Sequence, residues 1–228
     1  MTESPRILQV RANVLKDNDV LARLMRERFA QAGTLVLNLV SSPGSGKTTL
    51  LRQTLIDLSH RYRVAALVGD LATDNDARRL AESGVPVRQI ETKTLCHLEA
   101  RMIEENLQGW DLNQIDMLFI ENVGNLVCPS SWDLGEDLRI AMFATTEGED
   151  KPLKYPTLIN TADMALITKI DLAEAVEFDR LAMYRNLREM RPDIEILEIS
   201  SKNGTGMVAW LERLEHALKT KRTNHEAI

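Results

Sequence analysis

Two cysteines and a histidine are the first residues whose types could do chemistry. Cys96 and His97 are neighbours in the segment TLCHLEA, and Cys128 is the only other cysteine of the 228-residue chain. Thiolate and imidazole are ligands that Ni²⁺ and Zn²⁺ both accept. Two cysteines do not form a disulfide framework, and in a reducing compartment such residues are more often metal-binding or catalytic. The spacing alone leaves open the alternative that these are buried thiols beside a solvated histidine.

A second group of residues has the pattern of a phosphate-binding loop. The segment SSPGSGKTT follows an apolar run and precedes a helical pattern, which is the context that such a loop needs. Its glycines let backbone N–H groups turn toward phosphate oxygens, its lysine supplies positive charge, and its threonine hydroxyl binds Mg²⁺. Ser41 replaces the usual first glycine, and a glycine-rich turn without a ligand is the alternative interpretation. The predicted nucleotide-binding residues of this loop are Gly44, Ser45, Gly46, Lys47, Thr48 and Thr49.

Acidic residues follow two other apolar runs. Glu121 ends the run MLFIE, where it would reach Mg²⁺ directly or through water, and Gly124 completes an E-x-x-G element that could sense a γ-phosphate. The segment GDLATDNDA carries Asp70, Asp74 and Asp76, of which one would bind Mg²⁺ through water and another would orient the attacking water. The alternative is that Asp74 caps a helix and Asp76 pairs with its dipole. We predict catalytic roles for Lys47, Asp70, Asp76 and Glu121, and Mg²⁺ binding by Thr48, Glu121 and Asp70.

Two further segments predict that the base of the nucleotide is guanine. TKIDL follows an apolar run, and Asp171 can accept hydrogen bonds from guanine N1 and N2, while the Lys169 stem packs over the base. Adenine lacks this pair of donors, so a buried carboxylate there would discriminate strongly against ATP. In ISSKNG, Ser201 and Lys202 belong to a loop whose backbone N–H groups would face guanine O6. Thr168 stands where an asparagine is usual, which we expect to weaken the support of this loop.

The elements that must position these residues alternate along the chain. Short apolar runs separated by helical patterns predict an α/β fold, with a mostly parallel central sheet covered by helices on both faces. In such a sheet the loops that carry Cys96 and Cys128 can lie on one edge, both near the γ-phosphate. We expect an N-terminal segment and helix over 1–33, a P-loop GTPase domain over 34–220 and a flexible tail over 221–228. The expected strands are 34–40, 64–70, 87–91, 116–122, 138–145, 164–169 and 194–200, and the expected helices are 13–32, 46–61, 74–84, 97–109, 177–190 and 205–220.

Composition narrows the class of protein further. The formal net charge of −6 at pH 7 argues against nonspecific binding of nucleic acid. No apolar run reaches the length of a membrane-spanning helix, and the first residues lack the apolar core of a secretion signal. We therefore predict a cytoplasmic protein with neither nucleic-acid nor membrane partners.

Several motifs together resemble one known family. The segments are NLVSSPGSGKTTLL, GDLATDNDA, CHLEARM, FIENVGNLVCPSSWDLGE, TEGEDKPLKYP, TKIDL and SSKNGTGMVAWL, which span Asn38 to Leu211. They are similar to the hydrogenase nickel-incorporation GTPases, HypB, of the SIMIBI class of P-loop GTPases. The resemblance implies a GTPase with a slow intrinsic rate that binds GTP or GDP, Mg²⁺, and Ni²⁺ or Zn²⁺. It also implies a homodimer with GTP that shares a metal site made by Cys96, His97 and Cys128.

The same resemblance implies a role and partners, and this chain also departs from the family pattern. It implies delivery of nickel to a [NiFe]-hydrogenase large-subunit precursor, with a HypA-type zinc-containing nickel chaperone as partner. Many members carry Thr-Gly-Thr-Gly before the Cys-His pair, where this chain has TKTL, so Lys93 and Leu95 should stiffen that loop. The alternatives are a urease-accessory GTPase, whose Cys-Pro-His triplet is broken here by Ser130, and a GTP-gated metal carrier with negligible turnover.

Overall fold

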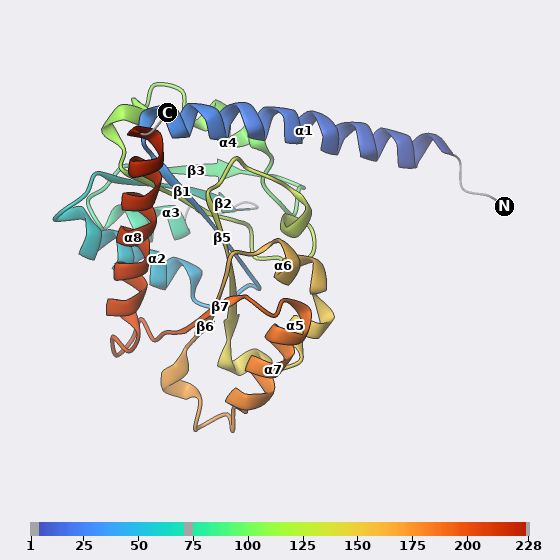
Figure 1. The fold of residues 1–228 in the computed structure, drawn as a ribbon, viewed down its shortest axis with the longest axis vertical. Coiled ribbons are helices and arrows are strands. Elements are labelled where there is room, and N and C mark those ends of the chain that lie inside the picture. Colours follow the sequence, from blue (N-terminus) through green and yellow to red (C-terminus); the bar gives the residue numbers. More distant parts are fainter. Residues whose placement is uncertain (1–4, 71–74, 227–228) are drawn as a thin grey trace.

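The structure is a computed structural model that describes residues 5–70 and 75–226. Seven strands form one sheet in the order β3-β2-β4-β1-β5-β6-β7, and every neighbouring pair is parallel (Figure 1). This confirms the predicted fold class and makes the sheet wholly rather than mostly parallel. The strands are β1 Leu35–Ser41, β2 Val64–Asp70, β3 Val87–Glu91, β4 Met117–Glu121, β5 Leu138–Ala144, β6 Met164–Thr168 and β7 Glu195–Glu198.

Helices cover both faces of this sheet. The α-helices are α1 Pro5–Ala32, α2 Lys47–Ser59, α3 Asn75–Ala81, α4 Ala100–Asn106, α5 Lys151–Lys154, α6 Pro156–Thr161, α7 Arg180–Met190 and α8 Met207–Glu226. Short 3₁₀ turns are η1 Leu112–Gln114, η2 Pro129–Ser131, η3 Thr145–Glu147 and η4 Ile170–Leu172.

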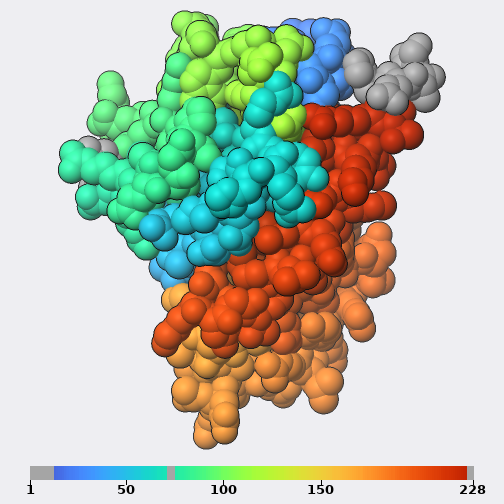
Figure 2. Space-filling view, turned by 90° about the vertical axis from the view of Figure 1, so that its left-hand side faces the viewer, coloured from blue at the N-terminus to red at the C-terminus, as the bar shows by residue number. Residues whose placement is uncertain are grey.

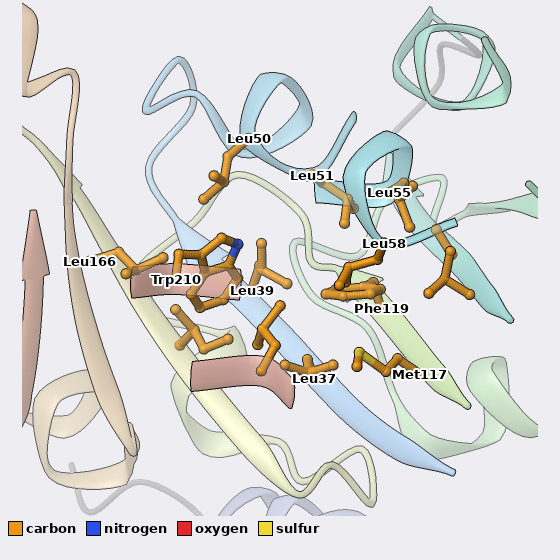
Figure 3. Packing of buried hydrophobic residues seen from close by; sticks show 14 of the residues in the cluster. Leu37, Leu39, Leu50, Leu51, Leu55, Leu58, Met117, Phe119, Leu166 and Trp210 are labelled. Atoms are coloured by element: carbon orange, nitrogen blue, oxygen red, sulfur yellow. The ribbon is translucent and has the colours of Figure 1, made fainter. Parts of the chain in front are cut away.

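The core has two layers because alternate residues of a strand point to opposite faces. Leu37 and Leu39 of β1 face α2 and α8, where Trp210 is packed among leucines and its indole N–H donates to Thr54 Oγ1 at 2.9 Å (Figure 3). Val36 faces the opposite layer, where residues of α1 and α4 join the same cluster. α8 crosses the first face beside the segment that contains α2 and α3 (Figure 2). Strands buried on both faces explain why the sequence shows continuous apolar runs.

The N-terminal helix is longer than the expected 13–32. It begins at Pro5, reaches well beyond the sheet and ends before Gly33, whose φ of 66° stops it (Figure 1). Met25 and Phe29 anchor its second half in the core. Among the described residues, none of the helices is both long and apolar enough to cross a membrane.

Two other predicted boundaries differ from the structure. The helix expected over 97–109 begins only at Ala100, because Asn122 Oδ1 accepts from Leu98 N and Asn18 Oδ1 accepts from Ala100 N. The expected flexible tail is helical as far as Glu226, since α8 continues through Lys221 and Arg222. Lys221 pairs with Asp137 and Arg222 pairs with Asp116, so the last turns are held against the sheet.

Candidate nucleotide and metal site

The candidate site lies at the carboxyl edge of the sheet, where parallel α/β folds bind their ligands. β1 ends at Ser41 before the phosphate loop, β2 ends at Asp70, β4 at Glu121 and β6 at Thr168. A cavity of about 500 Å³ opens at this edge. Of the predicted residues, those that line it are Gly44, Gly46, Lys47, Thr48, Thr49, Asp70, Asp76, Glu121, Gly124 and Lys169.

The phosphate loop has the backbone that its glycines predict. Gly44 and Gly46 take φ values of 77° and 94°, which L-residues with a side chain rarely adopt, and Gly46 caps the first turn of α2. Lys47 Nζ donates to Ser41 Oγ at 2.8 Å. The serine that replaces the usual glycine is therefore a buried partner of the lysine.

A glutamate that sequence reasoning missed is bonded to this loop. Glu147 accepts from Ser42 Oγ and from Ser45 Oγ, each at 2.9 Å. It lies after β5, within the segment TEGEDKPLKYP, so no local spacing connects it to the loop. Its two bonds tie the segment after β5 to the phosphate loop.

Thr48 and Glu121 form the candidate Mg²⁺ site. Thr48 Oγ1 donates to Glu121 Oε1 at 2.7 Å, while Glu121 Oε2 is buried and has no hydrogen-bond partner. Burial raises the pKa of Glu121 to about 7, although Lys47 and Thr48 act in the opposite direction. Burial also lowers the pKa of Lys47, against the attraction of Glu121, Asp76 and Glu147. An orphaned carboxylate oxygen beside a hydroxyl fits a hard cation that takes oxygen ligands.

The structure describes two of the three aspartates of GDLATDNDA. Asp70 and Asp76 line the cavity, and Asp74 lies outside the described residues. Asp76 is in the first turn of α3, as the helix-dipole alternative expected. Its position beside the cavity is equally compatible with a water-orienting role.

The predicted base-binding loops lie side by side. Ile170 N donates to Ile199 O at 3.3 Å, and Ser200 Oγ donates to Asp171 Oδ1 at 2.6 Å. The motif ISSKNG predicts Ser201 and Lys202 as the binding residues and does not indicate Ser200, which directly precedes them. Ser201 and Lys202 follow it outside the lining of the phosphate cavity, and Lys202 N donates to Ser200 Oγ at 3.2 Å.

Thr168 connects two loops of the site. Its hydroxyl donates to Ser45 O at 2.7 Å and so ties the base loop to the phosphate loop. That this support is weaker than an asparagine would give stays a prediction. Lys169 follows with a φ of 56°, and its Cε lies 4.0 Å from the position of a Cβ on Gly46.

The structure brings Cys96, His97 and Cys128 together. One ligand atom from each lies within 4.8 Å of the others, and Cys96 Sγ is 3.9 Å from His97 Nδ1. Hydrogen bonding to Cys128 and then burial raise the pKa of the Cys96 thiol. Both cysteines are free and half-buried. Two thiols and an imidazole at this distance can hold a borderline metal ion, although a closed structural zinc site needs a fourth ligand.

The histidine of this cluster is oriented by its surroundings. The His97 ring stacks on Trp132 with centroids 4.3 Å apart, and its Nε2 is 3.5 Å from Glu99 Oε1. Burial lowers the pKa of His97, while Glu99 acts in the opposite direction. With Nε2 toward Glu99, Nδ1 is the nitrogen that faces the thiols.

Short contacts connect the metal cluster to the nucleotide cavity. A Cβ on Gly124 would lie 3.1 Å from Pro43 of the phosphate loop, and the next residue, Asn125, donates from Nδ2 to Cys96 O at 3.2 Å. A Cβ on Gly69, at the end of β2, would lie 2.9 Å from three side-chain atoms of Leu98. The end of β2 and the turn after β4, which both border the cavity, are thus in contact with the Cys96–Leu98 segment.

A buried polar network fixes the loop that carries Cys128. Asn122 Nδ2 donates to Asn38 Oδ1 at 3.2 Å, and Asn38 Nδ2 donates to Glu136 Oε1 at 3.0 Å. Glu136 pairs with Arg139 at 2.7 Å, and Arg139 donates to the carbonyls of Ser130 and Trp132. The loop after Cys128 is therefore held by charge-assisted bonds in addition to the packing of Leu134 in the core.

Comparison with known proteins gives a consistent set of relatives. The family description "CobW/HypB/UreG, nucleotide-binding domain" matches residues 35–198. The hydrogenase maturation factor HypB of Escherichia coli K12 is 49% identical over 210 residues, covering 92% of this chain and 72% of the relative. The crystal structure of HypB from Helicobacter pylori in complex with nickel has a TM-score of 0.84 and 41% identity, covering 92% of this chain and 97% of that one. The crystal structure of HypB from Archaeoglobus fulgidus has a TM-score of 0.83 and 36% identity, and the match covers 90% of this chain and 100% of that one.

Proposed function

The chain belongs to the HypB hydrogenase maturation factors of the CobW/HypB/UreG nucleotide-binding family, and on this premise we propose that it is a GTP-hydrolysing metallochaperone. Its cargo is Ni²⁺ or Zn²⁺, and it delivers nickel during maturation of a [NiFe] hydrogenase. The observation that carries this proposal is the Cys96–His97–Cys128 cluster, which adjoins the phosphate cavity at two points. The Cys96 carbonyl accepts a hydrogen bond from Asn125 in the turn after β4, and Leu98, the residue after His97, packs with its side chain against Gly69 near the end of β2. The free thiols suit a reducing cytoplasm.

The nucleotide half of the proposal assigns roles to the cavity residues. Lys47 and the N-terminus of α2 bind the phosphates, and Asp171, held by Ser200, accepts from guanine N1 and N2. Thr48, Glu121 and Asp70 would hold Mg²⁺. The ion would neutralise charge on the β- and γ-phosphate oxygens. Asp76 orients the attacking water, and without a dedicated glutamine the intrinsic rate is slow.

In the metal-binding half of the proposal, the ion is cargo that the protein delivers. One chain offers two thiols and one imidazole, whereas two chains face to face offer four thiolates and two imidazoles. We infer a site shared across a homodimer, assembled with GTP and loosened after hydrolysis. A HypA-type zinc-containing chaperone and a hydrogenase large-subunit precursor are the proposed partners. Supporting this, the solved relative from Helicobacter pylori is described as a complex with nickel.

One experiment tests both halves. Metal stoichiometry and particle mass are measured for the full chain in GDP and in a non-hydrolysable GTP analogue, each with Mg²⁺. We expect a monomer with GDP, and with the analogue a dimer that binds one Ni²⁺ per two chains. Unchanged mass and stoichiometry between the two nucleotides would contradict the shared site. Single-turnover hydrolysis, with and without Ni²⁺, separates a GTPase from a carrier with negligible turnover.

A further inference from the structure

The nucleotide cavity contains an arginine to which the proposed mechanism gives no role. Arg79 lies on α3 and lines the same cavity as Lys47, Asp76 and Glu121. Its Nη2 donates to Thr49 Oγ1 at 3.3 Å, and its Nη1 is 3.8 Å from Asp76 Oδ1. About half of the side chain, 52%, is exposed, so these contacts leave the guanidinium free to turn within the cavity.

The charges of the cavity favour a role for this arginine at the phosphates. Its described lining holds the carboxylates Asp70, Asp76 and Glu121 and the cations Lys47, Arg79 and Lys169. Lys169 lies at the base-binding loop, which leaves Lys47 and Arg79 for the phosphates. A bound triphosphate adds several negative charges beside three carboxylates, and during hydrolysis charge shifts toward the leaving oxygen. A second mobile cation beside Lys47, the N-terminus of α2 and Mg²⁺ would stabilise this redistribution.

The position of Arg79 favours the reacting end of the cavity. It is three residues after Asp76, the proposed water-orienting residue, and on the same side of α3. Its charge also reaches Glu121, whose pKa it acts to lower against the larger effect of burial. A planar guanidinium can donate two parallel hydrogen bonds to phosphate oxygens, which an ammonium cannot. The neighbouring Arg78 does not line the cavity and provides a natural control.

We propose that Arg79 is a catalytic residue that contacts the γ-phosphate of bound GTP and stabilises the charge that develops during hydrolysis. In this step the water oxygen forms a bond to the γ-phosphorus while the bond from that phosphorus to the β–γ bridging oxygen breaks. The electron pair of the broken bond stays on GDP. Of the two water protons, one stays on the new P–O bond of the inorganic phosphate, and the other passes to a phosphate oxygen or to solvent. Arg79 exchanges its bond to Thr49 for bonds to the phosphate. The inference rests on the proposed GTPase function.

The test compares Arg79→Ala, Arg79→Lys and Arg78→Ala with the unmodified full chain. Single-turnover GTP hydrolysis is measured with saturating Mg²⁺, and GDP affinity is measured by equilibrium titration. We expect Arg79→Ala to lower the rate by about 100-fold, the size of effect seen when one donor to a reacting oxyanion is removed. GDP affinity should change less than about twofold, since GDP lacks the γ-phosphate. Arg79→Lys should fall between, and Arg78→Ala should keep the full rate.

Chemical rescue protects the test from a folding artefact. Guanidinium ion at millimolar concentration should restore part of the rate of Arg79→Ala and leave Arg78→Ala unaffected. An Arg79→Ala rate within about threefold of an active unmodified chain would overturn this inference alone. This inference alone would also be overturned if Arg79→Ala lowered the hydrolysis rate and the GDP affinity by equal factors. An unmodified chain that binds GTP but never hydrolyses it would overturn the proposed GTPase function, and this inference with it.

Discussion

The phosphate cavity and the cysteine–histidine cluster occupy the same edge of the sheet but differ in how they are built. Lys47, Thr48 and Glu121 are at most 8% exposed and belong to α2 and β4, so regular structure fixes them. Cys96 and Cys128 are half-buried and lie on loops. All groups that the proposed function assigns to the nucleotide come from one chain, whereas the metal cluster of one chain offers three ligand atoms. On the proposed function, one chain is therefore sufficient for nucleotide binding, while the metal site is shared between two chains.

The two regions are nevertheless in direct contact. Pro43 touches Gly124, Asn125 donates to Cys96 O, and Leu98 packs on Gly69. A nucleotide that shifts either strand end must therefore shift the segment that carries Cys96 and His97. The following predictions separate the two regions and then probe the contact between them.

The largest expected effect is on hydrolysis, from Lys47→Ala. Lys47 is the buried cation of the phosphate loop, and its loss should lower GTP turnover by about 1,000-fold or more because no other described group replaces its charge at that position. Ni²⁺ binding by the isolated chain should remain, since Cys96, His97 and Cys128 do not contact it. Phosphate release and a spectroscopic Ni²⁺ titration measure the two effects. Loss of Ni²⁺ affinity along with turnover would show that the regions are not separable.

The converse variant removes the metal site. Cys96→Ala with Cys128→Ala should weaken Ni²⁺ and Zn²⁺ binding by at least about 100-fold, because two of three ligand atoms are gone. GTP affinity should stay within about twofold, since neither thiol lines the phosphate cavity. His97→Ala should cost less if four thiolates carry most of the binding in a dimer. Full-strength metal binding by the double variant would end the interpretation of this cluster as a metal site.

The sequence predicts residues in local patterns better than residues that tertiary packing brings to the site. Lys47, Thr48 and Glu121 lie in local patterns next to predictable strands, so spacing alone predicts that they meet at one cavity. Glu147, Arg79 and Ser200 were not predicted, because each reaches its partner through tertiary packing.

The predicted start of α4 was wrong for a similar reason. The side chains of Asn122 and Asn18 are distant in sequence, yet they take the N–H groups of Leu98 and Ala100. The proximity of Cys96 and Cys128 could be anticipated only because parallel strands bring their following loops to one edge.

The contact between the regions is tested by Gly69→Ala. The added Cβ would lie 2.9 Å from three atoms of Leu98, so Leu98 must move. We expect a loss of about 1–3 kcal/mol in the free energy of unfolding, as for other insertions into packed sites. Metal affinity should also fall, because Leu98 follows His97 directly. Adding Leu98→Ala should recover part of both losses, and a double-mutant cycle by urea unfolding measures the coupling. Purely additive effects would show that Leu98 does not transmit the shift.

Ionisation of Glu121 should make the metal-free protein sensitive to pH. Its pKa of about 7 lies above the ordinary 4.5 because of burial. Such a carboxyl stabilises the folded state most below pH 4.5, and this contribution is lost as the pH rises to about 7. Glu121→Gln cannot ionise, so with chelator and without nucleotide it should be about 1–2 kcal/mol more stable than the unmodified chain at pH 8. The difference should shrink toward pH 4.5 in urea unfolding curves. An advantage that grows toward acid pH would contradict the direction of the shift.

The smallest expected effect is in the turn before the metal cluster. Lys93 has a φ of 55°, and the turn is closed by bonds from Leu95 N to Thr92 O and from Thr92 Oγ1 to Leu95 O. A non-glycine residue in this left-handed region costs about 1 kcal/mol, but glycine also gains freedom in the unfolded chain. Lys93→Gly should therefore change the free energy of unfolding by less than about 1 kcal/mol and leave GTP hydrolysis unchanged, whereas Lys93→Ala keeps the strained backbone and serves as control. Ni²⁺ affinity should change by less than about threefold if ligands from a second chain organise the cluster. A tenfold loss on Lys93→Gly would instead mean that the stiff turn positions Cys96 in advance, so that the metal cluster is as preorganised as the phosphate cavity.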